Sequence, residues 1–387
     1  MSFDPRAPLP DAPDPWAGSE MPQRRDGPPW AMTEMIDAEP ALAARLVRRL
    51  QADPSLGRVA DAVRDAARAG EPITTTGCGT SQHAAMAMAA LLTDGLAALA
   101  PAVRVHAIQA FELTGSRPLG GVTIAVSHEG GTEATNQALA HAGGREGRTA
   151  LVTVSDRSPG AALAREVLVT GEQDQSWCHT VGYLSPLVAG ACLRAALRGE
   201  ALDADAAADQ VAAGANARAA ELAADGLIRA ARLLVVGSGV DHVAARELAL
   251  KVEEGVHLPA TAHELETLRH GHLAAADDRT GLVLVLADGE DRGTELVERA
   301  GTVLRQAAAL GMSAVVIGST DREPSADAAL AGRIPVPLHP RLDRLTAAVL
   351  GVVTPLQLLT ERLARARGVN PDPIGRNDPR QAAAASA

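Results

Sequence analysis

Aromatic side chains are scarce in this chain, whose 387 residues include three Trp, two Phe and one Tyr. So few rings argue against a stacking surface for single-stranded DNA or RNA. Positive charge is also short: 36 Lys and Arg face 47 Asp and Glu, and the net charge of −11 argues against duplex binding. No apolar run reaches about 18 residues, and no secretory leader is evident. We therefore expect a cytoplasmic protein that contacts neither nucleic acid nor membrane.

Cysteine and lysine are the other scarce residues. The three cysteines are widely spaced and form no C-x-x-C pair, which predicts reduced thiols and supports neither disulfides nor a zinc site. Of the 36 Lys and Arg residues, only Lys251 is a lysine. An ammonium group can give up its proton whereas a guanidinium group cannot. The presence of a single lysine is therefore as consistent with a catalytic role for Lys251 as with chance.

The order of periodic segments predicts an α/β fold. Residues 1–31 are rich in proline, with eight in the first 30 positions, and we expect a disordered tail there. Helical periodicity from residue 32 is followed by short β-branched runs that alternate with helical segments. This alternation is typical of a doubly wound parallel sheet.

The second half of the chain repeats the first. Gly77 and Gly237 are 160 residues apart, as are Ser127 and Ala287, and each of the four follows a short apolar run. Two pairs at one offset predict tandem copies of one α/β unit. We expect a first domain, a second domain and a C-terminal tail closing over the site, at residues 32–202, 203–368 and 369–387 respectively.

Two glycine-rich loops in the first copy follow predicted strands and precede predicted helices, where backbone N–H groups and the helix dipole favour an anion. Their residues are Cys78, Gly79, Thr80 and Ser81 in one loop and Ser127, His128, Glu129, Gly130, Gly131 and Thr132 in the other. Neither has the spacing of a nucleotide-binding loop, and the alternative is a pair of turns with helix caps. The corresponding loops of the second copy carry more acids and fewer hydroxyls, which predicts one site per subunit.

A group of acid–base residues lies in the second copy. Lys251 and Glu254 are three residues apart in a predicted helix, so they share a face, and His270 follows in a polar segment. A base, an acid and a group that titrates near neutrality suit proton transfer at a carbonyl. Taken singly, Lys251 and Glu254 are equally consistent with a surface ion pair, and an isolated loop histidine is more commonly exposed to water.

These motifs resemble the sugar isomerase (SIS) superfamily. The resemblance is to the isomerase half of glutamine–fructose-6-phosphate aminotransferase and to relatives without the glutaminase half, such as SIS-type glucosamine-6-phosphate deaminases and fructosamine-6-phosphate deglycases. It covers roughly residues 32–380 and is carried by the two loops, by ALKVEE…ELETLRHGHLA and by the VTPLQLLTERLARARGVNPD ending. It implies an α/β fold of two tandem doubly wound parallel-sheet SIS domains, with no metal and no redox cofactor.

The resemblance also implies roles for individual residues. Glu254 would move the proton between C1 and C2, Lys251 would assist at the sugar oxygens, and His270 would open the sugar ring. In the family this histidine enters the neighbouring subunit's site, which implies a homodimer. The two glycine-rich loops, with Gln175 and Arg380, would bind the sugar or its phosphate.

Three departures from the family pattern bear on the substrate. The sequence shows no glutaminase domain before residue 32, so we expect no glutamine-dependent transfer unless a separate subunit supplies ammonia. Glu129 replaces a serine of the phosphate loop, and a carboxylate about 4 Å from a phosphate charge costs on the order of 4 kcal/mol. The stretch 171–184 holds two of the six aromatic residues where the family has small polar ones, and Arg380 lies near the position of a missing tail lysine.

We expect an SIS-type aldose/ketose isomerase or deaminase that acts on an amino sugar or its phosphate, similar to glucosamine 6-phosphate or fructose 6-phosphate, without glutaminase activity. The alternative is a ketosamine deglycase acting on an unphosphorylated substrate, which Glu129 and the altered stretch 171–184 favour. A non-catalytic sugar-sensing module is the third hypothesis. The acid–base residues count against it, because a sensor has no need of them.

Overall fold

The computed structural model describes residues 25, 27–115, 117–288, 293–321 and 330–385. Most of the predicted disordered tail therefore lies outside the described residues, as does part of the second-copy loop after Ala287. Trp30, inside the predicted tail, is buried in the core, and Arg25 forms an ion pair with Glu34 at 2.5 Å.

Two five-stranded sheets form the framework, and neighbouring strands in both are parallel. The first has the order β2-β1-β3-β4-β5, with β1 (Ile73–Gly77), β2 (His106–Gln109), β3 (Val122–Val126), β4 (Arg148–Thr153) and β5 (Glu166–Val169). The second has the order β7-β6-β8-β9-β10, with β6 (Arg232–Gly237), β7 (Ala260–Glu264), β8 (Thr280–Leu286), β9 (Ser313–Ser319) and β10 (Leu330–Val336). The α/β fold is thus confirmed, and the equal order of the two sheets agrees with the predicted repeat.

Helices surround both sheets, as buried parallel strands require. The first half contains α1 (Ala31–Ala52), α2 (Pro54–Ala69), α3 (Thr80–Gly95), α4 (Ala110–Thr114), α5 (Glu133–His141), α6 (Pro159–Leu163) and α7 (Val181–Arg198), with a 3-10 turn at Gly144–Glu146. The second contains α8 (Ala204–Ala213), α9 (Ala217–Leu227), α10 (Val240–Val256), α11 (Leu265–Arg269), α12 (Gly293–Ala309), α13 (Arg344–Gly351), α14 (Val353–Ala366) and α15 (Pro379–Ala385), with a 3-10 turn at His272–Ala275.

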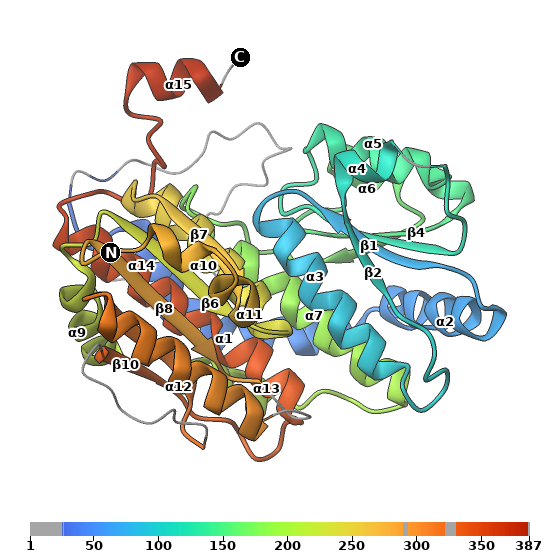
Figure 1. The fold of residues 1–387 in the computed structure, drawn as a ribbon. Coiled ribbons are helices and arrows are strands. Elements are labelled where there is room, and N and C mark those ends of the chain that lie inside the picture. The colour runs from blue at the N-terminus through green and yellow to red at the C-terminus, as the bar shows by residue number, and fades with distance from the viewer. Residues whose placement is uncertain (1–24, 26, 116, 289–292, 322–329, 386–387) are drawn as a thin grey trace.

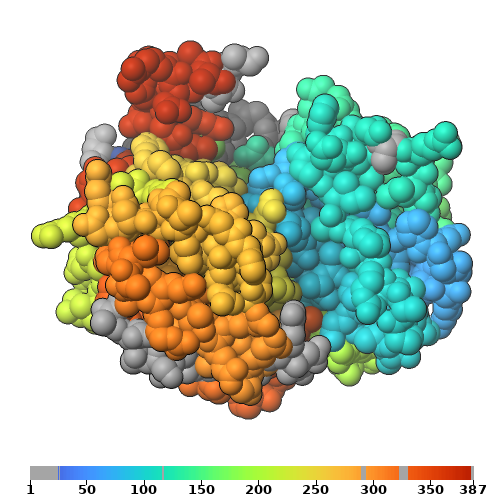
Figure 2. All heavy atoms as spheres, viewed as in Figure 1, coloured from blue at the N-terminus to red at the C-terminus, as the bar shows by residue number. Residues whose placement is uncertain are grey.

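The two halves pack on each other through helices (Figure 1). Helix α3 consists largely of Ala, Met and Leu and contacts both α7 and α10, while α1 crosses over to contact α8 and α14. The predicted domain boundary at residues 202 and 203 falls in the connection between α7 and α8. Helix α15 projects beyond the rest of the surface (Figure 2). The packing of α3 on α10 brings the loop after β1 next to the helix that carries Lys251 and Glu254.

The internal repeat extends to backbone detail. Gly79 and Gly239, again 160 positions apart, have nearly the same dihedral angles, with φ of 57° and 62° and ψ of −130° in both. A side chain on Gly77 or Gly237 would put its Cβ within 2.7 Å or 2.3 Å of the following helix backbone. Both strand-to-helix turns therefore need glycine for the same steric reason.

One helical stretch differs from the expectation that no apolar segment is long enough to cross a membrane. Residues Arg344–Ala366, which comprise α13 and α14, satisfy that test by length and composition. Within the fold, however, 94% of the most apolar window is buried. Core helices pass the same test, so this stretch is weak evidence for a membrane span.

Glu39 of α1 is a buried carboxyl group at the contact between α1 and α14. It accepts hydrogen bonds from Gln357 Nε2 at 2.8 Å and from Thr354 Oγ1 at 3.4 Å. Burial raises the pKa of Glu39 from 4.5 to about 8. Between these two pH values the folded chain keeps a proton that the unfolded chain loses, so the free energy of unfolding falls as the pH rises through this window.

Glu39→Gln removes this titration. We expect the variant to gain stability relative to the wild type as the pH rises from about 5 to about 8, by on the order of 4 kcal/mol over the window. Thermal unfolding of both proteins at half-unit pH steps measures the difference. A difference that does not change with pH would contradict the prediction.

Candidate active site

A cavity of about 530 Å³ opens at the carboxyl ends of β1 and β3, the edge of a parallel sheet where ligands bind. Its walls come from the loops after these strands, from the segment before α7, from α10 and from the segment after α14. The lining residues are Cys78, Gly79, Thr80, Ser81, His128, Glu129, Thr132, Trp177, His179, Glu254, Ile374 and Arg376. Eight of these residues are among those that the sequence predicts.

Lys251 and Glu254 form a direct ion pair on this wall, as their spacing on a helix predicts. Lys251 Nζ lies 2.6 Å from Glu254 Oε2, and the lysine is fully buried whereas the glutamate side chain is 24% exposed and lines the cavity. Burial opposes the charge of Lys251, but Glu254 and Glu247 outweigh it and raise the pKa of the lysine above its usual range. Lys251 is therefore a fixed ammonium group rather than a lysine that loses its proton.

Glu247 is a buried partner of Lys251 that the sequence analysis missed. Its carboxylate lies 3.4 Å from Lys251 Nζ. It also accepts a hydrogen bond from Thr80 Oγ1 at 3.0 Å and contacts His83 Nδ1 at 2.8 Å. Burial raises the pKa of Glu247, but Lys251 and then His83 outweigh it, so the pKa lies below its usual value. An acid four residues before the lone lysine, within an apolar helix, is the signal that could have revealed it.

His270 does not reach the cavity of its own chain. It follows the last residue of α11, its side chain is 78% exposed, and Nε2 lies 3.3 Å from Glu266. The role in a neighbouring subunit that the resemblance implies therefore stays a prediction.

The loop after β3 uses its own hydroxyl groups internally. Ser127 is buried, and its Oγ accepts the Gly130 N–H at 3.2 Å and lies 3.5 Å from Thr132 Oγ1. Gly130 has a φ of 71°, and a Cβ there would lie 2.2 Å from Ser158 Oγ, so this turn requires glycine. Ser127, Gly130 and Gly131 shape the loop without lining the cavity.

Two neutral histidines lie at this loop, His128 within it and His179 beside it. His128 Nε2 accepts the Asp174 N–H at 2.9 Å, and the rings of His128 and His179 are 5.1 Å apart. Burial lowers the pKa of His128 to about 4 and holds that of His179 well below its usual value. Neither ring therefore supplies positive charge to a phosphate at neutral pH.

Glu129 lines the same cavity. Gln173 Nε2 lies 3.5 Å from Glu129 Oε1. Burial raises the pKa of Glu129, and the positive charge of Arg376 opposes this shift. The glutamate that replaces a serine of the phosphate loop therefore lines the cavity and is not turned away from it.

The segment after α14 completes the cavity. Asp372 accepts the N–H groups of Ala31 and Met32 at 2.9 Å, which fastens this segment to the start of α1, and its own carbonyl accepts the Trp177 N–H at 3.0 Å. The guanidinium carbon of Arg376 lies 4.6 Å from the centre of the Trp177 ring.

Two predicted binding residues lie elsewhere. The side chain of Arg380 is 91% exposed and that of Gln175 does not line the cavity, so Arg376 takes the place that the sequence analysis gave to Arg380.

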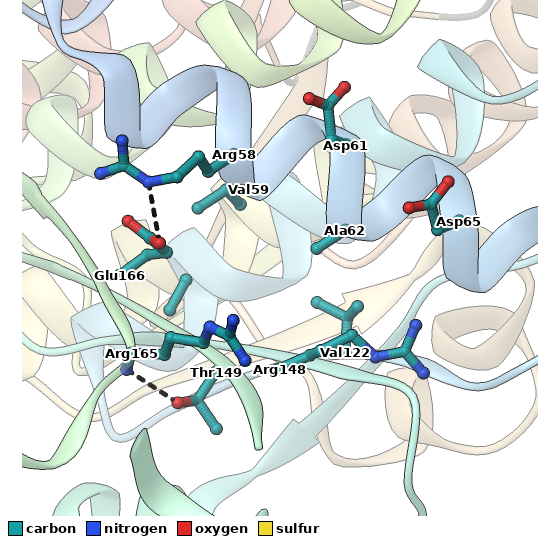
Figure 3. A pocket seen from close by; sticks show the side chains of 11 residues that line it. Arg58, Val59, Asp61, Ala62, Asp65, Val122, Arg148, Thr149, Arg165 and Glu166 are labelled. Carbon is teal, nitrogen blue, oxygen red and sulfur yellow. Dashed lines mark hydrogen bonds and ion pairs between the residues drawn. The ribbon is translucent and has the colours of Figure 1, made fainter. Parts of the chain in front are cut away.

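A second cavity, of about 330 Å³, lies under α2 at the opposite edge of the first sheet (Figure 3). Two of its arginines form ion pairs: Arg58 with Glu166 of the same cavity at 2.9 Å, and Arg148 with Glu71 outside it. It contains none of the predicted residues. Within the described ranges, no group of three or more His, Cys, Asp or Glu could hold a metal ion.

Comparison with known proteins agrees with this fold. Residues 226–360 match the SIS domain family. Two curated proteins named glutamine–fructose-6-phosphate aminotransferase [isomerizing] align with part of the chain. The one from Sphingobium yanoikuyae is 26% identical over 153 residues, which are 39% of this chain and 92% of that sequence. The one from Gloeobacter violaceus is 27% identical over 139 residues, which are 36% of this chain and only 21% of that protein.

Solved structures share the fold over most of the chain, each at 18% identity. The C-terminal domain of glucosamine-fructose-6-phosphate aminotransferase from Francisella tularensis has a TM-score of 0.72 and covers 90% of this chain and 99% of its own. Tagatose-6-phosphate ketose/aldose isomerase from Escherichia coli has a TM-score of 0.71, with coverage of 92% and 98%. Glucosamine-6-phosphate deaminase from Thermotoga maritima has a TM-score of 0.62, with coverage of 86% and 97%. The resemblance to the SIS superfamily is confirmed.

Proposed function

We propose that this SIS-fold chain is an enzyme that moves a proton between C1 and C2 of an open-chain amino sugar, as an isomerase or a deaminase. The observation that carries the proposal is the ion pair of Glu254 with the buried Lys251 on the wall of a cavity. The names of the relatives, which include isomerases and a deaminase of sugar phosphates, support the same class of reaction.

The residues act as a base and a fixed cation. Glu254 takes the proton from C2 of the open aldehyde, the electron pair forms the C1–C2 double bond, and the C1 oxygen gains a proton. Lys251 is buried and does not line the cavity, so it acts through Glu254: its positive charge, held between two carboxylates, fixes the Glu254 carboxylate in place beside the reacting carbons. Return of the proton to C1 gives a C2 imine, which water hydrolyses to a ketose and ammonia. His270 from a second copy of the chain would open the ring beforehand.

Hydrogen exchange with the solvent tests this step without knowledge of the final product. In D₂O, the enzyme should introduce deuterium at C1 or C2 of glucosamine, glucosamine 6-phosphate or fructose 6-phosphate, and NMR or mass spectrometry measures its position. Exchange at neither carbon, with the whole panel and with protein shown to be dimeric, would contradict the proposal.

A ketosamine deglycase is the second candidate, and Glu129 favours it. In a ketosamine the amine is on C1, so Glu254 would take the C1 proton and return it to C2, and water would split the resulting C1 imine into an aldose and a free amine. The carboxyl group of Glu129 in the cavity disfavours a phosphate and tolerates a protonated amine. Release of ammonia from glucosamine 6-phosphate would support the deaminase, and release of a larger amine the deglycase.

A further inference from the structure

Arg376 is the one Lys or Arg among the described residues that line the cavity. We propose that its guanidinium group binds the carboxylate of an amino acid that is joined to the sugar through its amine. The substrate class is thus an unphosphorylated ketosamine of an amino acid. This inference rests on the proposed function in its deglycase form.

The position of Arg376 is well fixed. Asp372 fastens the segment to the start of α1, and φ values of 44° at Ile374 and 82° at Gly375 turn the chain so that the arginine enters the cavity. Its backbone N–H donates to the Pro373 carbonyl at 2.9 Å, and its guanidinium carbon lies 4.6 Å from the centre of the Trp177 ring. Stacking on an aromatic ring orients a guanidinium plane and leaves its N–H edge for a ligand.

The donors of Arg376 are available. In the part of the chain that the structure describes, its side chain forms no hydrogen bond or ion pair. The other cationic candidates cannot replace it, because Lys251 is fully buried between two carboxylates and the rings of His128 and His179 are neutral.

The remaining charges of the cavity favour a carboxylate with a nearby amine over a phosphate. Glu129 and Glu254 both line the cavity, and Lys251 pairs with Glu254, so a doubly charged phosphate would face the carboxyl group of Glu129 with Arg376 as the one lining Lys or Arg among the described residues. An amino acid conjugate presents one carboxylate, which matches the two parallel N–H groups of an arginine, and one protonated amine, which matches the acids. The Ser127 hydroxyl does not offset these charges, because it is used inside the loop and does not line the cavity.

Calorimetry with a pair of isosteric ligands tests the inference. The fructose ketosamine of glycine carries a carboxylate where that of isobutylamine carries two methyl groups. In the full chain with Glu254→Gln, which prevents turnover, we expect the glycine conjugate to bind about 10- to 100-fold more tightly. Adding Arg376→Gln should reduce this ratio to less than about threefold. Adding Arg380→Gln instead should leave it unchanged, because that arginine is exposed and outside the cavity.

Three outcomes would overturn the inference. In the first, Arg376→Gln does not change the ratio of the two affinities. In the second, Arg380→Gln abolishes the preference for the glycine conjugate. The third concerns phosphate: a 6-phosphate added to the isobutylamine conjugate raises its affinity about tenfold, and Arg376→Gln removes this gain. Arg376 would then bind phosphate. If the ratio depends on Arg376 but wild-type protein releases no amine from the glycine conjugate, the binding site stands and the proposed deglycase function fails.

Discussion

Glu254→Gln is expected to lower kcat by about 10²- to 10⁴-fold, the contribution of a positioned general base. Glutamine has nearly the same shape as glutamate but cannot accept a proton from carbon. The fold should persist, because Lys251 keeps Glu247 as a partner at 3.4 Å and the substituted side chain is partly exposed to the cavity. Deuterium incorporation and product release measure kcat, and thermal unfolding checks that the melting temperature changes by only a few degrees.

Glu253→Gln is the matched control. Glu253 is the preceding residue of α10, is exposed, and accepts the Ala260 N–H at 3.2 Å. The same chemical change at this position should leave kcat within about twofold of the wild type. Equal losses in the two variants, or full activity in Glu254→Gln, would remove Glu254 from the mechanism.

The sequence predicts those parts of the site that lie on one element. Lys251 and Glu254 are one helical turn apart, so their ion pair follows from the period of the helix. The two glycine-rich turns follow from strand–glycine–helix order, and their duplication at a constant offset predicts two sheets of equal order. Local spacing decides all of these features, and local spacing is visible in a sequence.

The remaining parts depend on contacts between distant segments. Glu247 becomes a partner of Thr80 and His83 only because α3 packs on α10, more than 160 residues later in the chain. Arg376, rather than Arg380, enters the cavity because Asp372 fastens its segment to α1. The left-handed backbone conformation of Ile374 and Gly375 then turns the chain. A motif alignment places both arginines near the end of the chain but does not show which one turns inward.

Lys251→Met is expected to lower the free energy of unfolding by about 3–5 kcal/mol, the usual cost of removing one partner from a buried ion pair. Methionine has a similar length and no charge, so the loss comes chiefly from Glu247. Its carboxylate is fully buried, and without Lys251 its remaining partners among the described residues are Thr80 and His83. Denaturant unfolding of the full chain measures the change, and activity should fall as well because the fixed cation is lost.

Adding Glu247→Gln to Lys251→Met separates the charge effect from a packing effect. If the cost comes from an uncompensated carboxylate, the double variant should be more stable than Lys251→Met alone, with a coupling energy of about 1–3 kcal/mol between the two positions. If methionine merely packs poorly against α3, the two single losses should add, and the double variant should be the least stable of the three. Recovery of stability without recovery of activity would therefore assign Glu247 to holding Lys251 charged and in place, with the chemistry left to Glu254.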